Sequence, residues 1–125
     1  MKLLIIEDEE LLINTLEEKF LAEKFEVIKA ADGEDGLKKA LDIHPDVILL
    51  DILMPKIDGI TMLKELRKDS WGKHAKVVIL TNLNDTGKVA ESMGVGLDGS
   101  FTYLIKSDQT LESISKEINK VIGNI

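Results

Sequence analysis

The chain has 125 residues, of which 44% are hydrophobic and 31% are charged. A chain of this length forms one domain with a core of its own. The net charge of -7 argues against nucleic acid as a direct partner, and the absence of cysteine excludes disulfides, thiolate catalysis and Cys-based zinc sites.

Hydrophobic segments give no sign of a membrane protein. No apolar run approaches the roughly 20 residues that are needed to span a bilayer. The apolar opening of the chain stops at Glu7, too early for the hydrophobic region of a signal peptide. We therefore expect a cytoplasmic protein.

Short apolar runs and amphipathic segments alternate five times along the chain. The predicted strands are Leu3–Ile6, Phe25–Ala30, Val47–Leu50, Val77–Leu80 and Tyr103–Ile105. The predicted helices are Glu9–Lys24, Glu34–Ile43, Ile60–Lys68, a helix from Asn84 to about Met93, and Leu111–Ile122. This alternation is typical of a parallel sheet with helices on both of its faces.

Apolar spacing and polar residues at the helix starts predict which helix faces are buried and where the helices begin. The expected buried residues are Leu11, Leu12, Leu16 and Phe20 in the first helix, and Leu111, Ile114, Ile118, Val121 and Ile122 in the last. Asp58 is the predicted N-cap of the third helix, and Ser107 or Asp108 that of the last. We expect Trp71 to anchor a loop by packing on a helix end.

Polar residues follow the predicted strands where each strand ends. Glu7-Asp8 follows the first strand, Asp51 the third, Thr81 the fourth and Lys106 the fifth. Each residue alone has an ordinary explanation as a helix cap, a turn residue or a surface charge. Ligands of open α/β sheets bind beyond the carboxyl ends of the strands, so the combination indicates a site there.

The carboxylates of this group predict a magnesium site, because they would repel one another without a cation among them. Asp8 and Asp51 can supply one oxygen each, and the Leu53 carbonyl can supply a third. Glu7 can hold a metal-bound water. Mg²⁺ is therefore the expected cofactor.

The charges also predict a chemical role for Asp51 as a nucleophile that forms an aspartyl phosphate. The three equatorial oxygens of the transferred phosphoryl group need neutralising partners. The cation can serve one oxygen, the Thr81 hydroxyl another and the Lys106 ammonium the third.

These residues resemble the receiver domain of bacterial two-component response regulators over essentially the whole chain. The most specific part is the Asp-x-x-Met-Pro-x-x-Asp-Gly loop over Asp51–Gly59, and Glu7-Asp8, Thr81 and Tyr103–Lys106 complete the pattern. The resemblance implies a flavodoxin-like, doubly wound, five-stranded parallel sheet of order 2-1-3-4-5 with five helices. It also implies that residues 1–125 form one receiver domain, to which we expect no effector domain to be attached.

The resemblance further implies a role in phosphorelay signalling, as in single-domain chemotaxis regulators. Asp51 would accept a phosphoryl group from a histidine kinase or phosphotransfer protein, and Thr81 and Tyr103 would be the switch residues. The face formed by the fourth helix, fifth strand and fifth helix would then contact a downstream protein. Such a domain catalyses only its own phosphorylation and autodephosphorylation, and we expect a monomer or weak dimer.

The sequence departs from the family pattern at several positions. Ser107 stands where the family has a proline after a cis peptide bond, and a cis bond before a non-proline residue costs about 2.5–4 kcal/mol, which favours a trans Lys106-Ser107 bond. The segment before Lys106 is a few residues longer than usual, and we place the extra length in Gly94–Gly99. Asn82 replaces a smaller residue and is expected to crowd the movement of Thr81.

Two apolar residues near the site predict a long-lived phosphoryl group. Leu53 and Leu83 lie two residues beyond Asp51 and Thr81, where family members can orient the hydrolytic water. Neither side chain can hold a water, so we expect slow self-dephosphorylation.

Three other functions are compatible with a strand-end aspartate on such a sheet. A phosphohydrolase would need a second Asp two residues after Asp51, where Leu53 stands. A flavin carrier would need a glycine-rich phosphate loop where Glu7-Asp8 would repel phosphate. A phosphate-independent, receiver-like protein-interaction module remains the alternative, supported mainly by Ser107.

Overall fold

A computed structural model describes residues 1–52, 58–82 and 101–123. The strands are β1 (Lys2–Ile6), β2 (Glu26–Ala30), β3 (Val47–Asp51), β4 (Val77–Thr81) and β5 (Phe101–Ile105). The helices are α1 (Glu10–Ala22), α2 (Gly33–Ile43), α3 (Gly59–Lys68) and α5 (Leu111–Val121), with 3-10 turns η1 (Gly72–His74) and η3 (Lys106–Asp108). The helix predicted from Asn84 and the loop predicted over Gly94–Gly99 lie outside the described residues.

The five strands form one parallel sheet in the order β2-β1-β3-β4-β5, which confirms the predicted topology. The register pairs Ile6 with Leu50, Asp51 with Leu80, and Thr81 with Ile105. The carboxyl ends of β1, β3, β4 and β5 are therefore level with one another. Residues that directly follow these strands meet at one edge of the sheet.

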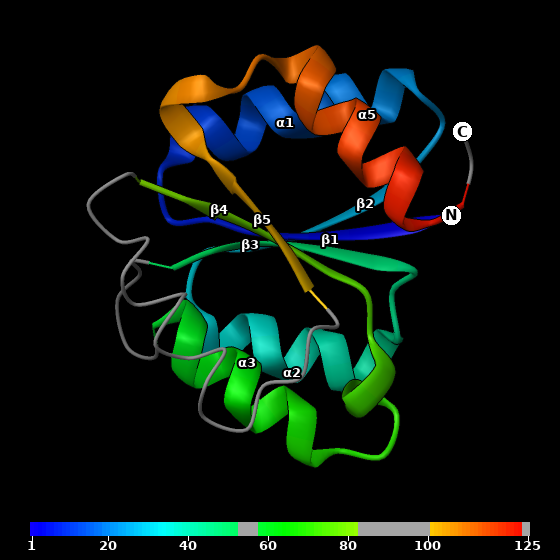
Figure 1. The fold of residues 1–125 in the computed structure, drawn as a ribbon. Coiled ribbons are helices and arrows are strands. Elements are labelled where there is room, and N and C mark those ends of the chain that lie inside the picture. Colours follow the sequence, from blue (N-terminus) through cyan, green and yellow to red (C-terminus); the bar gives the residue numbers. More distant parts are fainter. Residues whose placement is uncertain (53–57, 83–100, 124–125) are drawn as a thin grey trace.

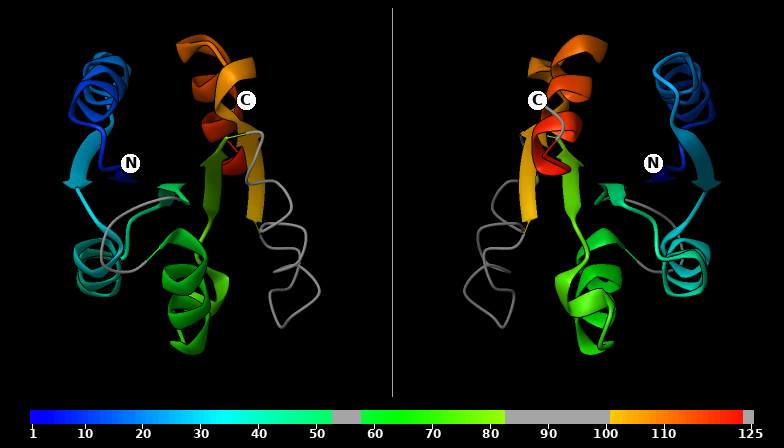
Figure 2. Two further views of the ribbon diagram at one scale, coloured as in Figure 1. Left: turned by 90° about the vertical axis from the view of Figure 1, so that its left-hand side faces the viewer. Right: turned by 90° about the vertical axis from the view of Figure 1, so that its right-hand side faces the viewer.

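The sheet lies between two helix layers, with α1 and α5 on one face and α2 and α3 on the other (Figures 1 and 2). Every residue of β3 and β4 is buried, as expected for central strands covered on both faces. One hydrophobic cluster joins the sheet to α2 and α3, and a second joins it to α1 and α5. Both clusters fix the central strands, whose carboxyl ends form the edge described above.

Two helix starts test the capping predictions. Asp58 caps α3 as predicted, since its Oδ1 accepts a hydrogen bond of 2.8 Å from the backbone N–H of Thr61. The predicted cap of the last helix is wrong, because Ser107 and Asp108 belong to the turn η3. Thr110 caps α5 instead, in a reciprocal pair of hydrogen bonds with Ser113.

The buried faces of α1 and α5 differ from the predicted stripes. Leu11 is 75% exposed, and the buried face of α1 consists of Ile13, Leu16 and Phe20, spaced by three and four residues. Leu111 is exposed as well, whereas the hydroxyl-bearing Ser115 is buried in α5. An uninterrupted apolar sequence at a helix start does not specify which of its residues faces the core.

Trp71 anchors the segment between α3 and β4, as predicted. It packs against the cluster under α2 and α3, and its ring stacks on that of His44 with centroids 4.2 Å apart. His44 is the C-cap of α2. The stack therefore ties the α3–β4 connection to the end of α2. Within the described ranges, no helix has the length and apolar character that crossing a membrane requires.

Candidate functional site

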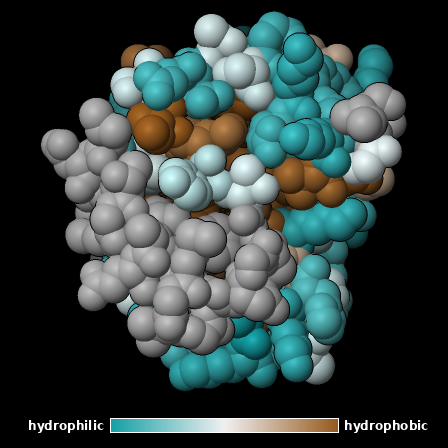
Figure 3. All heavy atoms as spheres, in the orientation of Figure 1, coloured by the Kyte–Doolittle hydropathy of each residue, from teal (hydrophilic) through white to brown (hydrophobic). Residues whose placement is uncertain are grey.

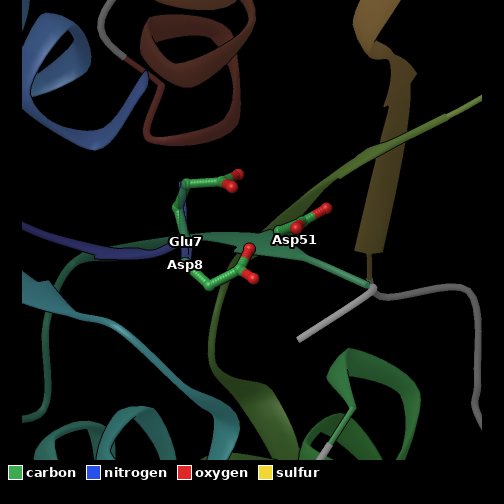
Figure 4. Close-up of side chains that lie close together, drawn as sticks. All are labelled: Glu7, Asp8 and Asp51. Carbon is green, nitrogen blue, oxygen red and sulfur yellow. The ribbon is translucent and has the colours of Figure 1, made fainter. Parts of the chain in front are cut away.

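Three carboxylates converge at the carboxyl edge of the sheet. Glu7 and Asp8 directly follow β1 and Asp51 ends β3, and Figure 4 shows the three carboxylate groups on the same side of these strand ends. One oxygen from each residue lies within 4.8 Å of the others. Glu7 is 3% exposed and Asp51 5% exposed, whereas Asp8 is exposed. The group has the donor chemistry of a divalent-cation site and is open to solvent on the side of Asp8.

Backbone groups fix two of these side chains. The N–H of Glu9 donates to Glu7 Oε1 over 3.1 Å, and the N–H of Ile52 donates to Asp51 Oδ1 over 2.9 Å. Each bond occupies one oxygen of a buried carboxylate. The carboxylates are thus oriented by the chain segments that follow β1 and β3.

Lys106 joins the acidic group from the end of β5. Its Nζ lies 3.2 Å from Glu7 Oε2 and 3.2 Å from Asp51 Oδ1. The Lys106 side chain is 20% exposed, so both ion pairs are largely shielded from water. One ammonium therefore bridges two nearly buried carboxylates from different strands.

The pKa values of the group reflect burial and the surrounding charge. Burial, reinforced by the Asp51 charge, raises the pKa of Glu7 to about 7. Burial also raises the pKa of Asp51, against the opposing effect of the Lys106 charge. Burial lowers the pKa of Lys106, but the charges of Asp51 and Glu7 outweigh it and the pKa is raised. Burial thus opposes the ionisation of Glu7 and Asp51, and the described residues place one ammonium beside three carboxyl groups, so a further cation would favour the ionised pocket.

Of the remaining predicted residues, Thr81 ends β4 at the same edge of the sheet, whereas Tyr103 lies in the middle of β5. Thr81 is fully buried, and its hydroxyl donates to the carbonyl oxygen of Asn82 over 3.2 Å. Tyr103 is 42% exposed on β5. Leu53, the predicted carbonyl ligand, lies outside the described residues. The Lys106-Ser107 bond is trans, since the described part of the chain has no cis peptide bond.

Gly59 is a residue of the site to which sequence analysis assigned no role. A Cβ at this position would lie 2.3 Å from the backbone oxygen of Asp51. The N–H of Gly59 also donates to the carbonyl oxygen of Ile52 over 2.7 Å. Only glycine permits α3 to begin this close to the end of β3. The Asp-Gly pair at the start of a helix was the available signal.

A family model described as "Response regulator receiver domain" matches residues 3–115. The chain belongs to the response regulator receiver domain family. The matched residues include every predicted site residue.

Individual relatives agree with this family. The probable transcriptional regulator ycf27 of Porphyridium aerugineum is 33% identical over 129 residues, covering 98% of this chain and 51% of that protein. The receiver domain of Francisella response regulator 1452 is 29% identical with a TM-score of 0.83, covering 98% and 96% of the two chains. A chain of the CheX-CheY-BeF3-Mg²⁺ complex from Borrelia burgdorferi is 28% identical with a TM-score of 0.81, covering 97% and 88%. The chain spans about half the length, or less, of the curated relatives it matches.

Proposed function

We propose that this receiver domain accepts a phosphoryl group on Asp51 in a Mg²⁺-dependent reaction and thereby signals to a protein partner. The observation that carries the proposal is the position of the Asp51 carboxylate. It is 5% exposed, lies within a cluster with two further carboxylates, and contacts the Lys106 ammonium at 3.2 Å. A structural carboxylate at a strand end has no need of such surroundings.

The donor atoms of the pocket fit Mg²⁺, which prefers carboxylate oxygens and keeps several waters. Asp8 and Asp51 would hold the ion, with Glu7 beside them. The Leu53 carbonyl stays a proposed third ligand. When bound, Mg²⁺ supplies positive charge that offsets the repulsion between an anionic phosphoryl donor and the Asp51 carboxylate.

The phosphoryl donor would be a phosphohistidine of a histidine kinase or phosphotransfer protein. An Asp51 oxygen forms a new bond to phosphorus, while the bond from phosphorus to the imidazole nitrogen breaks and its electron pair stays on the imidazole. The Lys106 ammonium, already 3.2 Å from Asp51, would stabilise charge on a phosphoryl oxygen. The Thr81 hydroxyl would leave the Asn82 carbonyl and donate to another phosphoryl oxygen.

The signal would leave the domain through the surface that includes β5 and α5. Turning of the Thr81 hydroxyl would alter the packing around Tyr103, whose side chain is 42% exposed in this structure. In Figure 3, hydrophobic surface is visible in the upper half of the molecule, where β5 and α5 lie in front. We propose that this surface, together with the predicted fourth helix, contacts the downstream partner. The Borrelia burgdorferi relative was crystallised as a CheX-CheY complex, which supports an output by protein contact.

Intact mass after incubation with acetyl phosphate and Mg²⁺ tests the proposal. The parent is expected to gain one phosphoryl group, and Asp51→Asn none. Asp46→Asn is the matched control, because Asp46 is exposed and directly precedes β3, at the end of the strand that is opposite to Asp51. It is expected to gain the phosphoryl group like the parent.

A parent that gains no phosphoryl group, although Mg²⁺ binding is confirmed by calorimetry, would contradict the proposal. That result would favour the phosphate-independent protein-interaction module. Labelling of Asp51→Asn equal to that of the parent would contradict the assignment of Asp51.

A further inference from the structure

A polar cluster joins α1 to α5 on the face of the sheet that bears both helices. The Ser115 hydroxyl donates to Glu23 Oε1, and Lys19 Nζ pairs with Glu23 Oε2 at 3.0 Å and with the Glu112 carboxylate. Asn119 Nδ2 donates to the carbonyl oxygen of Ser115 over 2.9 Å. These five residues are called the α1–α5 polar cluster below.

The polar cluster adds to the apolar contacts that hold α5 against the core, which include the partly buried Val121. Only two apolar side chains of this helix are buried, Ile114 and Ile118. The third buried residue is Ser115, 5% exposed, whose hydroxyl bonds to the Glu23 carboxylate across the helix interface. A buried hydroxyl that bonds to a charged group fixes the position of one helix along the other more narrowly than apolar contacts do.

Both helices connected by this cluster begin a few residues after a residue of the candidate site. Glu10 starts α1 two residues after Asp8. Lys106 opens the turn η3, and α5 begins at Leu111. A short connection that contains the turn η3 therefore links Lys106 to the start of α5.

Strand pairing alone holds Lys106 weakly. In the described sheet β5 is an edge strand, bonded only to β4. None of the side chains from Thr102 to Ile105 is fully buried. Among the described residues, the docking of α5 therefore adds to the pairing with β4 and to the packing of Leu104 against the core in holding the segment that carries the Lys106 ammonium.

We propose that Glu23 and Ser115 are positioning residues that hold the Lys106 ammonium between Glu7 and Asp51. They act through the location of α5 and touch none of the reacting groups. The expected effect of Glu23 and Ser115 on the position of Lys106, in the absence of Mg²⁺ and phosphate, is based on the observed ion pairs alone. The effect on phosphoryl transfer rests on the proposed function, since Lys106 must lie within hydrogen-bond distance of the phosphoryl oxygens.

The test compares Ser115→Ala and Glu23→Gln with the control Glu17→Gln. Glu17 lies on α1, which Glu23 caps, and is likewise ion-paired, but its partner is Lys29 of β2 rather than a residue of α5. The first measurement is the ¹⁵N resonance of the Lys106 side-chain ammonium, without Mg²⁺ or phosphodonor and assigned with Lys106→Arg. We expect it to move or broaden in Ser115→Ala and Glu23→Gln and to stay unchanged in Glu17→Gln.

The second measurement is the rate of labelling by acetyl phosphate with Mg²⁺, in conditions where circular dichroism shows every variant to be folded. Misplacement of a participating group by about 1 Å can reduce a rate by up to about a hundredfold. We expect a reduction of at least about threefold in both cluster variants and none in the control. The double variant is expected to be slowed by less than the product of the two single effects, because both substitutions weaken the same contact between Ser115 and Glu23.

An unchanged Lys106 resonance in folded Glu23→Gln and Ser115→Ala would overturn the inference, as would an equal change in Glu17→Gln. If Ser115→Ala does not fold, the Lys106 resonance of Glu23→Gln decides between the two outcomes. Glutamine keeps the size and one oxygen of glutamate, so this variant is expected to fold. A parent that takes up no phosphoryl group would refute the proposed function, and the resonance measurement would then decide the inference by itself.

Discussion

The Lys106 ammonium is the only cation within 4.0 Å of the acidic pocket among the described residues, and it contacts Glu7 and Asp51 equally at 3.2 Å. Removing it by Lys106→Met would leave two nearly buried carboxylates without that partner. In EDTA we expect the free energy of unfolding, measured by urea denaturation, to fall by about 1–3 kcal/mol. Mg²⁺ should restore part of this loss, because it brings positive charge to the same carboxylates.

Lys68→Met is the control for this measurement. Lys68 forms an exposed ion pair with Glu65 at 2.9 Å on the surface of α3. An exposed pair of this kind contributes less than about 1 kcal/mol. Equal losses of stability in the two variants would show that the Lys106 contacts have the energy of ordinary surface pairs.

Gly59 determines how closely α3 approaches the functional site. In Gly59→Ala, the new methyl group would meet the Asp51 carbonyl oxygen at 2.3 Å, and neither backbone can move without disturbing β3 or the helix start. We expect a loss of about 3 kcal/mol in urea denaturation, at the upper end for overpacking. Thr61→Ala, on an exposed residue in the same first turn, should change stability by less than about 0.5 kcal/mol. A fully stable Gly59→Ala protein would contradict the close approach.

At the scale of elements, the contact between α1 and α5 depends on pH through Glu23. Burial raises the pKa of Glu23, but hydrogen bonds from Ser115 and Lys19 outweigh it and the pKa is lowered. A carboxyl group with a lowered folded-state pKa stabilises the fold above its unfolded pKa and loses this contribution as the pH falls through the folded value. The loss therefore falls in the acid range, below the ordinary glutamate value of 4.5.

Glu23→Gln measures this contribution directly. At pH 7 the parent should be more stable than the variant by about 1 kcal/mol, and the difference should shrink towards zero as the pH falls below 4.5. Urea denaturation at a series of pH values gives the difference, with Glu18→Gln, an exposed residue of α1, as the control. A difference that is independent of pH would mean that the charge of Glu23 is not responsible.

The elements themselves were largely predictable from the sequence, but their contacts were not. The apolar run Val47–Leu50 predicted a central strand correctly because a strand buried on both faces needs no alternation. The exposed Leu11 and the buried Ser115 were missed, because a helix's rotation about its axis is set by the partner that it packs on. The cap at Thr110 was missed for a related reason, since the turn η3 had no signal of its own.

At the scale of the whole molecule, parallel strands explain why the sequence could predict that residues of the candidate site lie together. Equal register brings the carboxyl ends of β1, β3 and β5 to one edge of the sheet, so Glu7, Asp51 and Lys106 meet although they are far apart in sequence. Their exact contacts depend on the end of the edge strand and on helix docking. The sequence could therefore indicate which residues lie together, but it could not indicate that Lys106 forms ion pairs with both Glu7 and Asp51.

Binding of Mg²⁺ in the acidic pocket, as proposed above, would make the stability of the whole domain depend on the Mg²⁺ concentration. A ligand that binds only the folded state stabilises it by RT ln(1 + [L]/Kd), about 2.7 kcal/mol at a hundredfold excess over Kd. We expect MgCl₂ to raise the free energy of unfolding of the parent by about 1–3 kcal/mol. NaCl of equal ionic strength should have a much smaller effect, because it screens the three carboxylates without coordinating them. Thermal or urea denaturation provides the measurement.

Substitution in the pocket identifies the origin of this effect. Asp8→Asn removes the exposed carboxylate of the group, whose side chain faces solvent and contributes no buried packing. This substitution should abolish most of the Mg²⁺-dependent increase in the free energy of unfolding while leaving the fold intact. Asp46→Asn, at the opposite edge of the sheet, should retain the whole gain, because its Oδ2 accepts from the backbone N–H of Lys2 and is remote from the pocket. An undiminished response of Asp8→Asn to Mg²⁺ would place the ion elsewhere on this acidic protein.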